Sequence, residues 1–205
     1  MNAMVLLTAA ALLGALSFFE PCTIATHTLF SARSHTESRR RCCEGLMALW
    51  MSRSLLAVGL LVLAVLLTPS PQWGTIMPSV ALAVMASVYL ISRFLYIPVP
   101  HLEFHKLLPG GQRLPHTVQL GLILPACTLP LFVIILALAI TLDSTAAAVI
   151  AGLLFANLFT LPTAIAAMTG ISAGGRRFLH TSAVATPFIT AVLLFGAAIY
   201  LWPGD

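Results

Sequence analysis

Charge is what this sequence has least of. Only 8% of its 205 residues are charged, whereas 60% are hydrophobic, and the mean hydropathy is +1.02. A soluble domain carries about 25% charged residues, so the composition excludes a soluble globular protein. Strand-like segments of about ten alternating residues are also missing, which argues against an outer-membrane barrel. The four cysteines are too few for a secreted disulfide scaffold.

The hydrophobic residues fall into six long runs. Each run reaches the ~20 residues that a helix needs to cross a hydrocarbon core of ~30 Å. The sequence therefore predicts an all-α membrane protein with six transmembrane helices. The runs cover residues 3–30, 45–67, 76–97, 117–140, 144–169 and 181–202.

The basic residues lie in or beside three connections, near 31–44, 98–116 and 170–180. With six spans these three loops share one side of the membrane, and the positive-inside rule makes that side the cytoplasm. Both chain termini are then expected to be extracytoplasmic. The Lys and Arg residues are Arg33, Arg39, Arg40, Arg41, Arg53, Arg93, Lys106, Arg113, Arg176 and Arg177.

Each half of the chain reads as a three-span unit with Pro and Cys in its first span. The sequence around Cys22 is LSFFEPCTIATH, and the sequence around Cys127 is LILPACTLPLF. Because three is an odd number, the second unit enters the membrane from the opposite side, which predicts inverted repeats with Pro-broken first helices. We expect a first repeat at 1–97, a cytoplasmic connecting loop at 98–116 and a second repeat at 117–205.

The two membrane cysteines are expected at the same depth. Cys22 lies nine residues before Ser31, where the first cytoplasmic loop begins, and Cys127 lies eleven residues after His116, where the second long loop ends. At a rise of 1.5 Å per residue, both lie roughly 13–17 Å from the cytoplasmic edge. Equal depth alone does not make them neighbours, because a disulfide needs Cα atoms about 4.4–6.8 Å apart.

Prolines flank both cysteines and give them a chemical setting. Pro21, Pro125 and Pro130 each remove a backbone donor, so we expect a helix break at each site. Each cysteine then begins a second half-helix, whose free N–H groups and dipole favour the thiolate that attacks disulfides. Thr23 and Thr128 follow the cysteines and are expected to bond the freed carbonyls. The alternative is that each cysteine is a small core residue at an ordinary proline kink.

With these six spans and the paired Pro–Cys sites, the sequence resembles the CcdA family and the related transmembrane domain of DsbD. The resemblance implies a thiol–disulfide electron carrier of a bacterial inner membrane, in which Cys22 and Cys127 cycle between dithiol and disulfide. It implies electrons taken from cytoplasmic thioredoxin and passed to extracytoplasmic thioredoxin-like acceptors, which serves cytochrome c biogenesis. Pro21, Pro125 and Pro130 would shape the helix breaks. We expect no cofactor, since the sequence holds no nucleotide loop or haem-attachment CxxCH.

Glu20 is the only acidic residue well inside a span. A charge at the bilayer centre costs at least ~2.5–3.5 kcal/mol, so an acidic residue kept there indicates a functional role. Glu20 is either protonated or paired with His27, two turns further along the same face. As a neutral acid beside Cys22 it would exchange the thiol proton. The alternative is an acid that faces a water-filled cavity and aids its opening.

A soft-metal transporter is the rival function. Cys42 and Cys43 are adjacent in a basic loop, and together with Cys22 and Cys127 they would form a thiolate route for Cu or Hg. Otherwise Cys42 and Cys43 are reduced cytoplasmic thiols or a lipidation site. A third possibility is a structural membrane subunit.

Two further sets of residues have alternative interpretations. His101, Glu103 and His105 form an H-x-E-x-H run that would point three ligands one way on an extended segment, or else belong to an interfacial loop. Polar residues and prolines in the last two spans indicate kinked helices around a polar centre, for which a packing role suffices. These are Asn157, Thr160, Pro162, Thr163 and Pro187.

Overall fold

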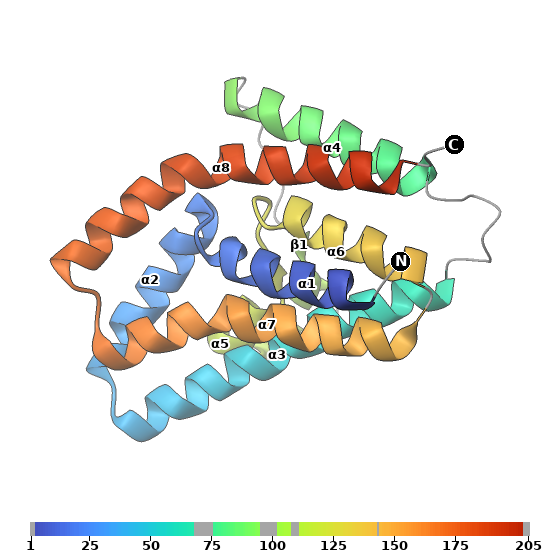
Figure 1. Cartoon of the computed structure of the whole chain (residues 1–205). Helices are drawn as coiled ribbons and strands as arrows, with labels where there is room; N and C mark the ends of the chain where they lie inside the picture. Colours follow the sequence, from blue (N-terminus) through green and yellow to red (C-terminus); the bar gives the residue numbers. More distant parts are fainter. Residues whose placement is uncertain (1–2, 68–75, 95–101, 108–110, 143, 203–205) are drawn as a thin grey trace.

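Helices account for almost all of the chain that the structure describes (Figure 1). The computed structural model describes residues 3–67, 76–94, 102–107, 111–142 and 144–202. In chain order the elements are α1 (Ala3–Phe18), α2 (Pro21–Thr36), α3 (Arg39–Leu67), α4 (Ile76–Phe94), β1 (Leu102–Glu103), η2 (Phe104–Lys106), η3 (Gly111–Arg113), α5 (His116–Gly121), β2 (Ile123–Leu124), α6 (Leu129–Leu142), α7 (Thr145–Thr169) and α8 (Ala173–Leu201).

Helix α7 is the helix against which α1, α2 and α3 pack (Figure 1). Small residues in its first turns, AAAVIAG, allow this close approach. A Cβ atom added at Gly152 would lie 2.9 Å from the Val58 backbone of α3, and one added at Gly14 of α1 would lie 2.7 Å from the Phe155 carbonyl oxygen. The two contacts need glycine, because any side chain there would meet backbone atoms.

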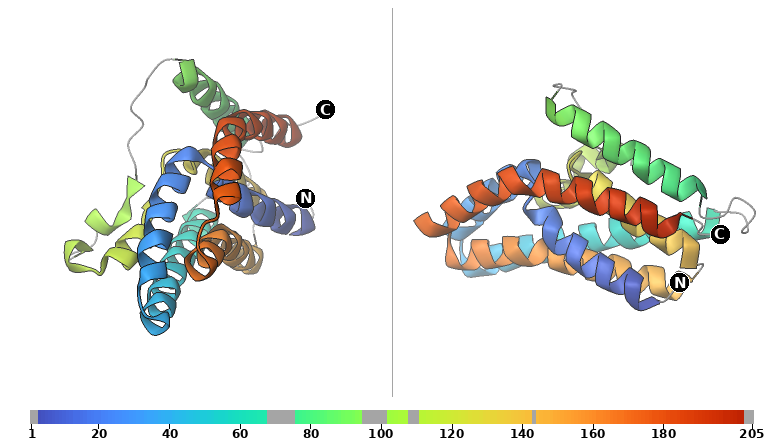
Figure 2. Two further views of the ribbon diagram at one scale, coloured as in Figure 1. Left: turned by 90° about the vertical axis from the view of Figure 1, so that its left-hand side faces the viewer. Right: turned by 45° about the horizontal axis from the view of Figure 1, so that its top comes forward.

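Helices α4 and α8 form a second pair that runs side by side, and α6 packs on both (Figure 2). The buried core joins apolar side chains of α1, α3, α4, α6, α7 and α8. The outer faces are apolar as well: Leu55 of α3 is 73% exposed and Ile199 of α8 is 74% exposed. A helix that is hydrophobic all round and exposed on one side is typical of a membrane protein, because lipid covers its outer face.

The sequence predicts six spans, with the first span of each repeat broken at a proline. In the described chain, three helices are by themselves long and apolar enough to cross a membrane: α3, α7 and residues Arg177–Leu201 of α8. The pair α1 and α2 makes a fourth if it counts as one span, bent by 70°. Helix α6 and the apolar Ser79–Val88 part of α4 are shorter. The fold is therefore an all-α membrane architecture, whereas six crossings and inverted repeats stay predictions.

The segment 98–116 is not simply a connecting loop. Its residues 98–101 and 108–110 lie outside the described chain, but β1 within it pairs antiparallel with β2, matching Leu102 with Leu124 and Glu103 with Ile123. The physical reason lies in the break near Pro125. Where the helix stops, backbone groups lose their helical partners and need others inside an apolar protein. The β1–β2 pair and the bond from the Phe104 N–H to the Leu122 carbonyl supply them.

Candidate functional site: a disulfide between two helix breaks

Cys22 and Cys127 are joined by a disulfide, with their Cα atoms 6.4 Å apart. The two residues are 105 positions apart in the sequence and come from different halves of the chain. Cys22 is the second residue of α2, and Cys127 lies in the turn between β2 and α6. The structure thus brings together the two cysteines that the sequence places at equal depth.

The first break lies between α1 and α2, where the sequence predicts it. Helix α1 ends at Phe18, Glu20 is extended with φ −67° and ψ 139°, and α2 begins at Pro21. Proline suits the first helical position, because its missing N–H would have no helical partner there in any case. The first backbone bond of α2 runs from the Ile24 N–H to the Glu20 carbonyl at 2.9 Å. Cys22 therefore sits in the first turn of a new helix.

The second break has a different geometry from the first. The carbonyl of Pro125 accepts bonds from the Thr128 N–H at 3.0 Å, the Leu129 N–H at 3.2 Å and the Thr128 hydroxyl at 2.9 Å. These bonds form a turn, and α6 begins only after it, with Pro130 in its first turn. Cys127 thus precedes its helix, which corrects the expectation that both cysteines begin a half-helix. The cause is the turn at residues 126–128, closed on the Pro125 carbonyl, which delays the start of α6 to Leu129.

The two threonines after the cysteines also behave differently. Thr128 bonds the freed Pro125 carbonyl, as the sequence predicts. The hydroxyl of Thr23 is buried and has no hydrogen-bond partner among the described residues, so the prediction is wrong for Thr23. The helix has no interruption at Thr23 for this hydroxyl to compensate, because α2 begins at Pro21 and continues through Thr23.

Glu20 lies directly at the first break and is fully buried, at 0% exposure. The hydroxyl of Thr190, from the middle of α8, donates a hydrogen bond of 2.7 Å to Glu20 Oε1. The acid is therefore tied to α8 across the bundle and lies two residues before Cys22 in the chain.

A buried polar cluster extends from α2 into α3 and α7. Nε2 of His27 lies 3.0 Å from Arg53 Nη2, and Nδ1 of His27 lies 3.0 Å from the Thr163 hydroxyl. Arg53 Nη1 donates to the Thr160 hydroxyl at 3.0 Å, and its guanidinium carbon lies 3.9 Å from the Phe159 ring centroid. Three helices thus meet around one guanidinium group.

Arg53 does not lie where the sequence predicts it. The sequence places it in or beside a loop, whereas in the structure it is buried, with only 3% of its surface exposed. Helix α3 begins at Arg39, so Arg53 lies about 21 Å along it, inside the apolar run rather than at its end. The signal in the sequence was there: LMALWMSRSLLAV has apolar residues on both sides of this arginine. Of the polar residues that the sequence places in the span of α7, Asn157 is exposed and accepts a 2.8 Å bond from the Trp50 indole.

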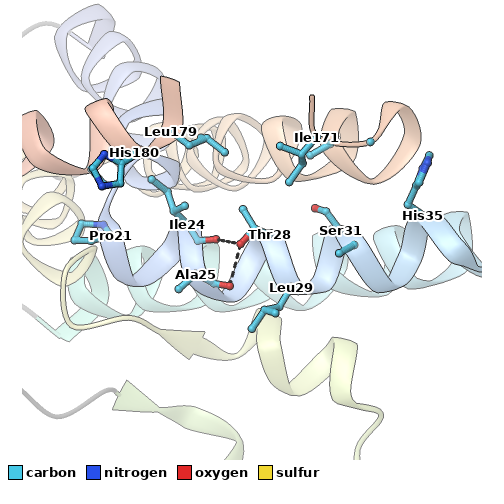
Figure 3. Close-up of a pocket in the computed structure, with 14 residues that line it drawn as sticks. Pro21, Ile24, Ala25, Thr28, Leu29, Ser31, His35, Ile171, Leu179 and His180 are labelled. Carbon is cyan, nitrogen blue, oxygen red and sulfur yellow. Dashed lines mark hydrogen bonds between the residues drawn. The ribbon is translucent and has the colours of Figure 1, made fainter. Parts of the chain in front are cut away.

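A cavity of about 630 Å³ runs along α2, from Pro21 at one end to His35 at the other (Figure 3). Residues of the end of α7 and of the first half of α8, including Leu179 and His180, line its opposite wall. Pro21 precedes Cys22 in the chain, although neither cysteine lines the cavity. The cavity gives a largely apolar path along α2 towards the helix end that the sequence predicts to be cytoplasmic.

Cys42 and Cys43 are free thiols near the start of α3, the first buried and the second exposed. The described residues contain no group of three or more His, Cys, Asp or Glu side chains placed to hold a metal ion. The metal route through Cys42 and Cys43 stays a prediction.

The H-x-E-x-H run is only partly described, since His101 lies outside the described residues. Glu103 Oε2 lies 2.8 Å from Lys106 Nζ and 3.6 Å from His105 Nε2. The Glu103 carboxylate is thus paired with a lysine three residues later.

No protein-family model, curated protein or solved structure matches the chain. Its function is therefore inferred from the geometry around Cys22 and Cys127.

Proposed function

We propose that this chain is a membrane thiol–disulfide oxidoreductase that carries reducing equivalents through the Cys22–Cys127 pair. The observation that carries the proposal is the disulfide between two helix breaks inside an apolar helix bundle. Thiol–disulfide exchange needs two sulfur atoms within bonding reach and a way for a third sulfur to approach them. The broken helices and the cavity along α2 support both requirements.

The reaction begins when a thiolate of cytoplasmic thioredoxin attacks one sulfur of the pair. A mixed disulfide forms, the Cys22–Cys127 bond breaks, and the released sulfur leaves with the electron pair. The second thiol of thioredoxin then resolves the mixed disulfide. Thioredoxin is oxidised, and the pair is reduced by two electrons and takes up two protons. Glu20, beside Cys22, exchanges one of these protons.

The reduced pair next attacks the disulfide of an extracytoplasmic thioredoxin-like acceptor and is reoxidised. This step needs the sulfurs to be presented to the other side of the membrane. We propose six crossings in two inverted repeats, 1–97 and 117–205, with both termini extracytoplasmic. The bent pair α1–α2 and the segment α5–β2–α6 would be the moving first span of each repeat. By its resemblance to CcdA, the protein would serve cytochrome c biogenesis in a bacterial inner membrane.

Transfer across a vesicle membrane tests the proposal. Thioredoxin, its reductase and NADPH are supplied on one side, and a disulfide-bonded thioredoxin-fold acceptor is enclosed on the other. We expect the acceptor to become reduced with the parent chain, and Cys22→Ser or Cys127→Ser to abolish its reduction.

The control is the double variant Cys42→Ser, Cys43→Ser, which removes the two free thiols away from the pair and should keep transfer. Retained transfer with Cys127→Ser would overturn the proposal. Uptake of Cu or Hg ions into the same vesicles, lost on removing Cys42 and Cys43, would instead establish the metal transporter.

A further inference from the structure

Arg53 places a positive charge inside the bundle, and no described residue puts a carboxylate beside it. The ion pairs of the described residues join Glu44 or Glu103 to residues of their own segments, and the polar contacts of Arg53 are Thr160 and His27. Its Nε has no partner among the described residues. Arginine stays protonated in proteins, and a buried charge without a counter-charge is costly. The site is therefore electrostatically complementary to an anion.

The proposed reaction creates an anion close by. When the disulfide opens, one sulfur leaves as a thiolate, and the reduced pair must later attack as a thiolate. His27 follows Cys22 by five residues, about 7.5 Å along the α2 axis. His27 also points about 140° away from Cys22 around α2, so the guanidinium that it contacts lies roughly 10–15 Å from the Cys22 sulfur. At an effective dielectric constant of about 20, two unit charges at this separation change an ionisation equilibrium roughly tenfold.

The surroundings favour Cys22 over Cys127 as the site of the thiolate. Cys22 lies in the first turn of α2, where free N–H groups favour negative charge. Cys127 lies in the turn before α6 and not within a first helical turn. Glu20 lies two residues before Cys22, and its ionised form would oppose a thiolate, which a fixed positive charge offsets.

We propose that Arg53, held by His27 and Thr160, is the fixed counter-charge that stabilises the Cys22 thiolate of the reduced pair. The proposal rests on the proposed function and assigns a positioning residue to it. Arg53 acts through its field and forms no bond in the reaction.

The test measures the alkylation rate of a single thiol in the otherwise complete chain. In a Cys42→Ser, Cys43→Ser, Cys127→Ser background, Cys22 reacts with iodoacetamide at one fixed, mildly alkaline pH. We expect Arg53→Gln to slow this reaction about tenfold, because the thiolate fraction falls, and Arg53→Lys to restore most of the rate, because it keeps the charge.

A second pair of variants keeps Arg53 in place. Thr160→Asp puts a carboxylate where the hydroxyl accepts from Arg53 and cancels the field, whereas Thr160→Asn has the same shape without the charge. We expect Thr160→Asp to react about tenfold more slowly than Thr160→Asn. Equal rates for this pair would overturn the proposal, even if Arg53→Gln does not fold.

The alkylation experiment involves no electron transfer, so the two proposals fail separately. A charge-dependent alkylation rate in a chain that does not reduce the vesicle acceptor overturns the proposed function only. Transfer that depends on Cys22 and Cys127, together with charge-independent alkylation, overturns the counter-charge only.

Discussion

Adding one methyl group at Gly152 or Gly14 should destabilise the bundle. The new Cβ would lie 2.9 Å from Val58 backbone atoms at position 152 and 2.7 Å from the Phe155 carbonyl oxygen at position 14, whereas ordinary contact begins at 3.4 Å. The helices must therefore separate by roughly 0.5–0.7 Å, and backbone atoms cannot rotate away as a flexible side chain would. Overpacking of this kind costs about 1–3 kcal/mol.

Gly59 and Gly196 provide matched controls, because a Cβ at either position meets nothing within 4 Å. Both lie inside helices, where alanine is more favourable than glycine by roughly 0.5–1 kcal/mol. The measurement is the free energy of unfolding in detergent micelles, from denaturant titration followed by circular dichroism. We expect Gly152→Ala and Gly14→Ala to be less stable than the parent, and Gly59→Ala and Gly196→Ala to be equal or more stable. If all four substitutions had the same effect, the inferred close approach of α1 and α3 to α7 would be wrong.

Two further substitutions probe the polar groups of the site. Glu20→Gln keeps an oxygen that can accept from Thr190, so we expect the free energy of unfolding to change by less than about 1 kcal/mol. The amide cannot carry a proton, so vesicle transfer should slow about 100-fold, the scale of general acid–base catalysis. Transfer at the parental rate would remove Glu20 from the mechanism. Trp50→Phe removes the indole bond to Asn157 and should lower the free energy of unfolding by about 1 kcal/mol in the same titration, with vesicle transfer unchanged. A loss of transfer without a loss of stability would contradict the packing role of this contact.

The candidate site could be predicted in part, and the difference between its two halves shows why. At Pro21 the local sequence is decisive, because proline at a first helical position fixes where α2 begins and hence where Cys22 lies. At Pro125 the same rule correctly predicts a break, but the new helix begins only at Leu129, so Cys127 lies before it. That outcome depends on the turn around the Pro125 carbonyl and on the pairing of β2 with β1, which precedes the break in the chain.

Arg53 shows a second limit. A basic residue within an apolar run has two interpretations: it marks the cytoplasmic membrane surface, or it is buried between helices. The sequence does not distinguish them, because it does not show which residues the side chain contacts. Its partners are His27, 26 positions before it, and Thr160, 107 positions after it. Only the packing of α2, α3 and α7 on one another determines that these side chains meet.

By itself, the sequence determined the helical membrane class and the first helix break. Hydropathy and proline act locally: a long apolar run must satisfy its own backbone hydrogen bonds as a helix, and proline interrupts that pattern wherever it stands. The tertiary structure decided what lies next to what: the joining of Cys22 to Cys127, the burial of Arg53, and the shortness of α6. These features depend on contacts between separate elements, from Leu102 with Leu124 to Arg53 with Thr160, 107 positions apart. Such contacts form only when whole elements pack, so no local pattern specifies them.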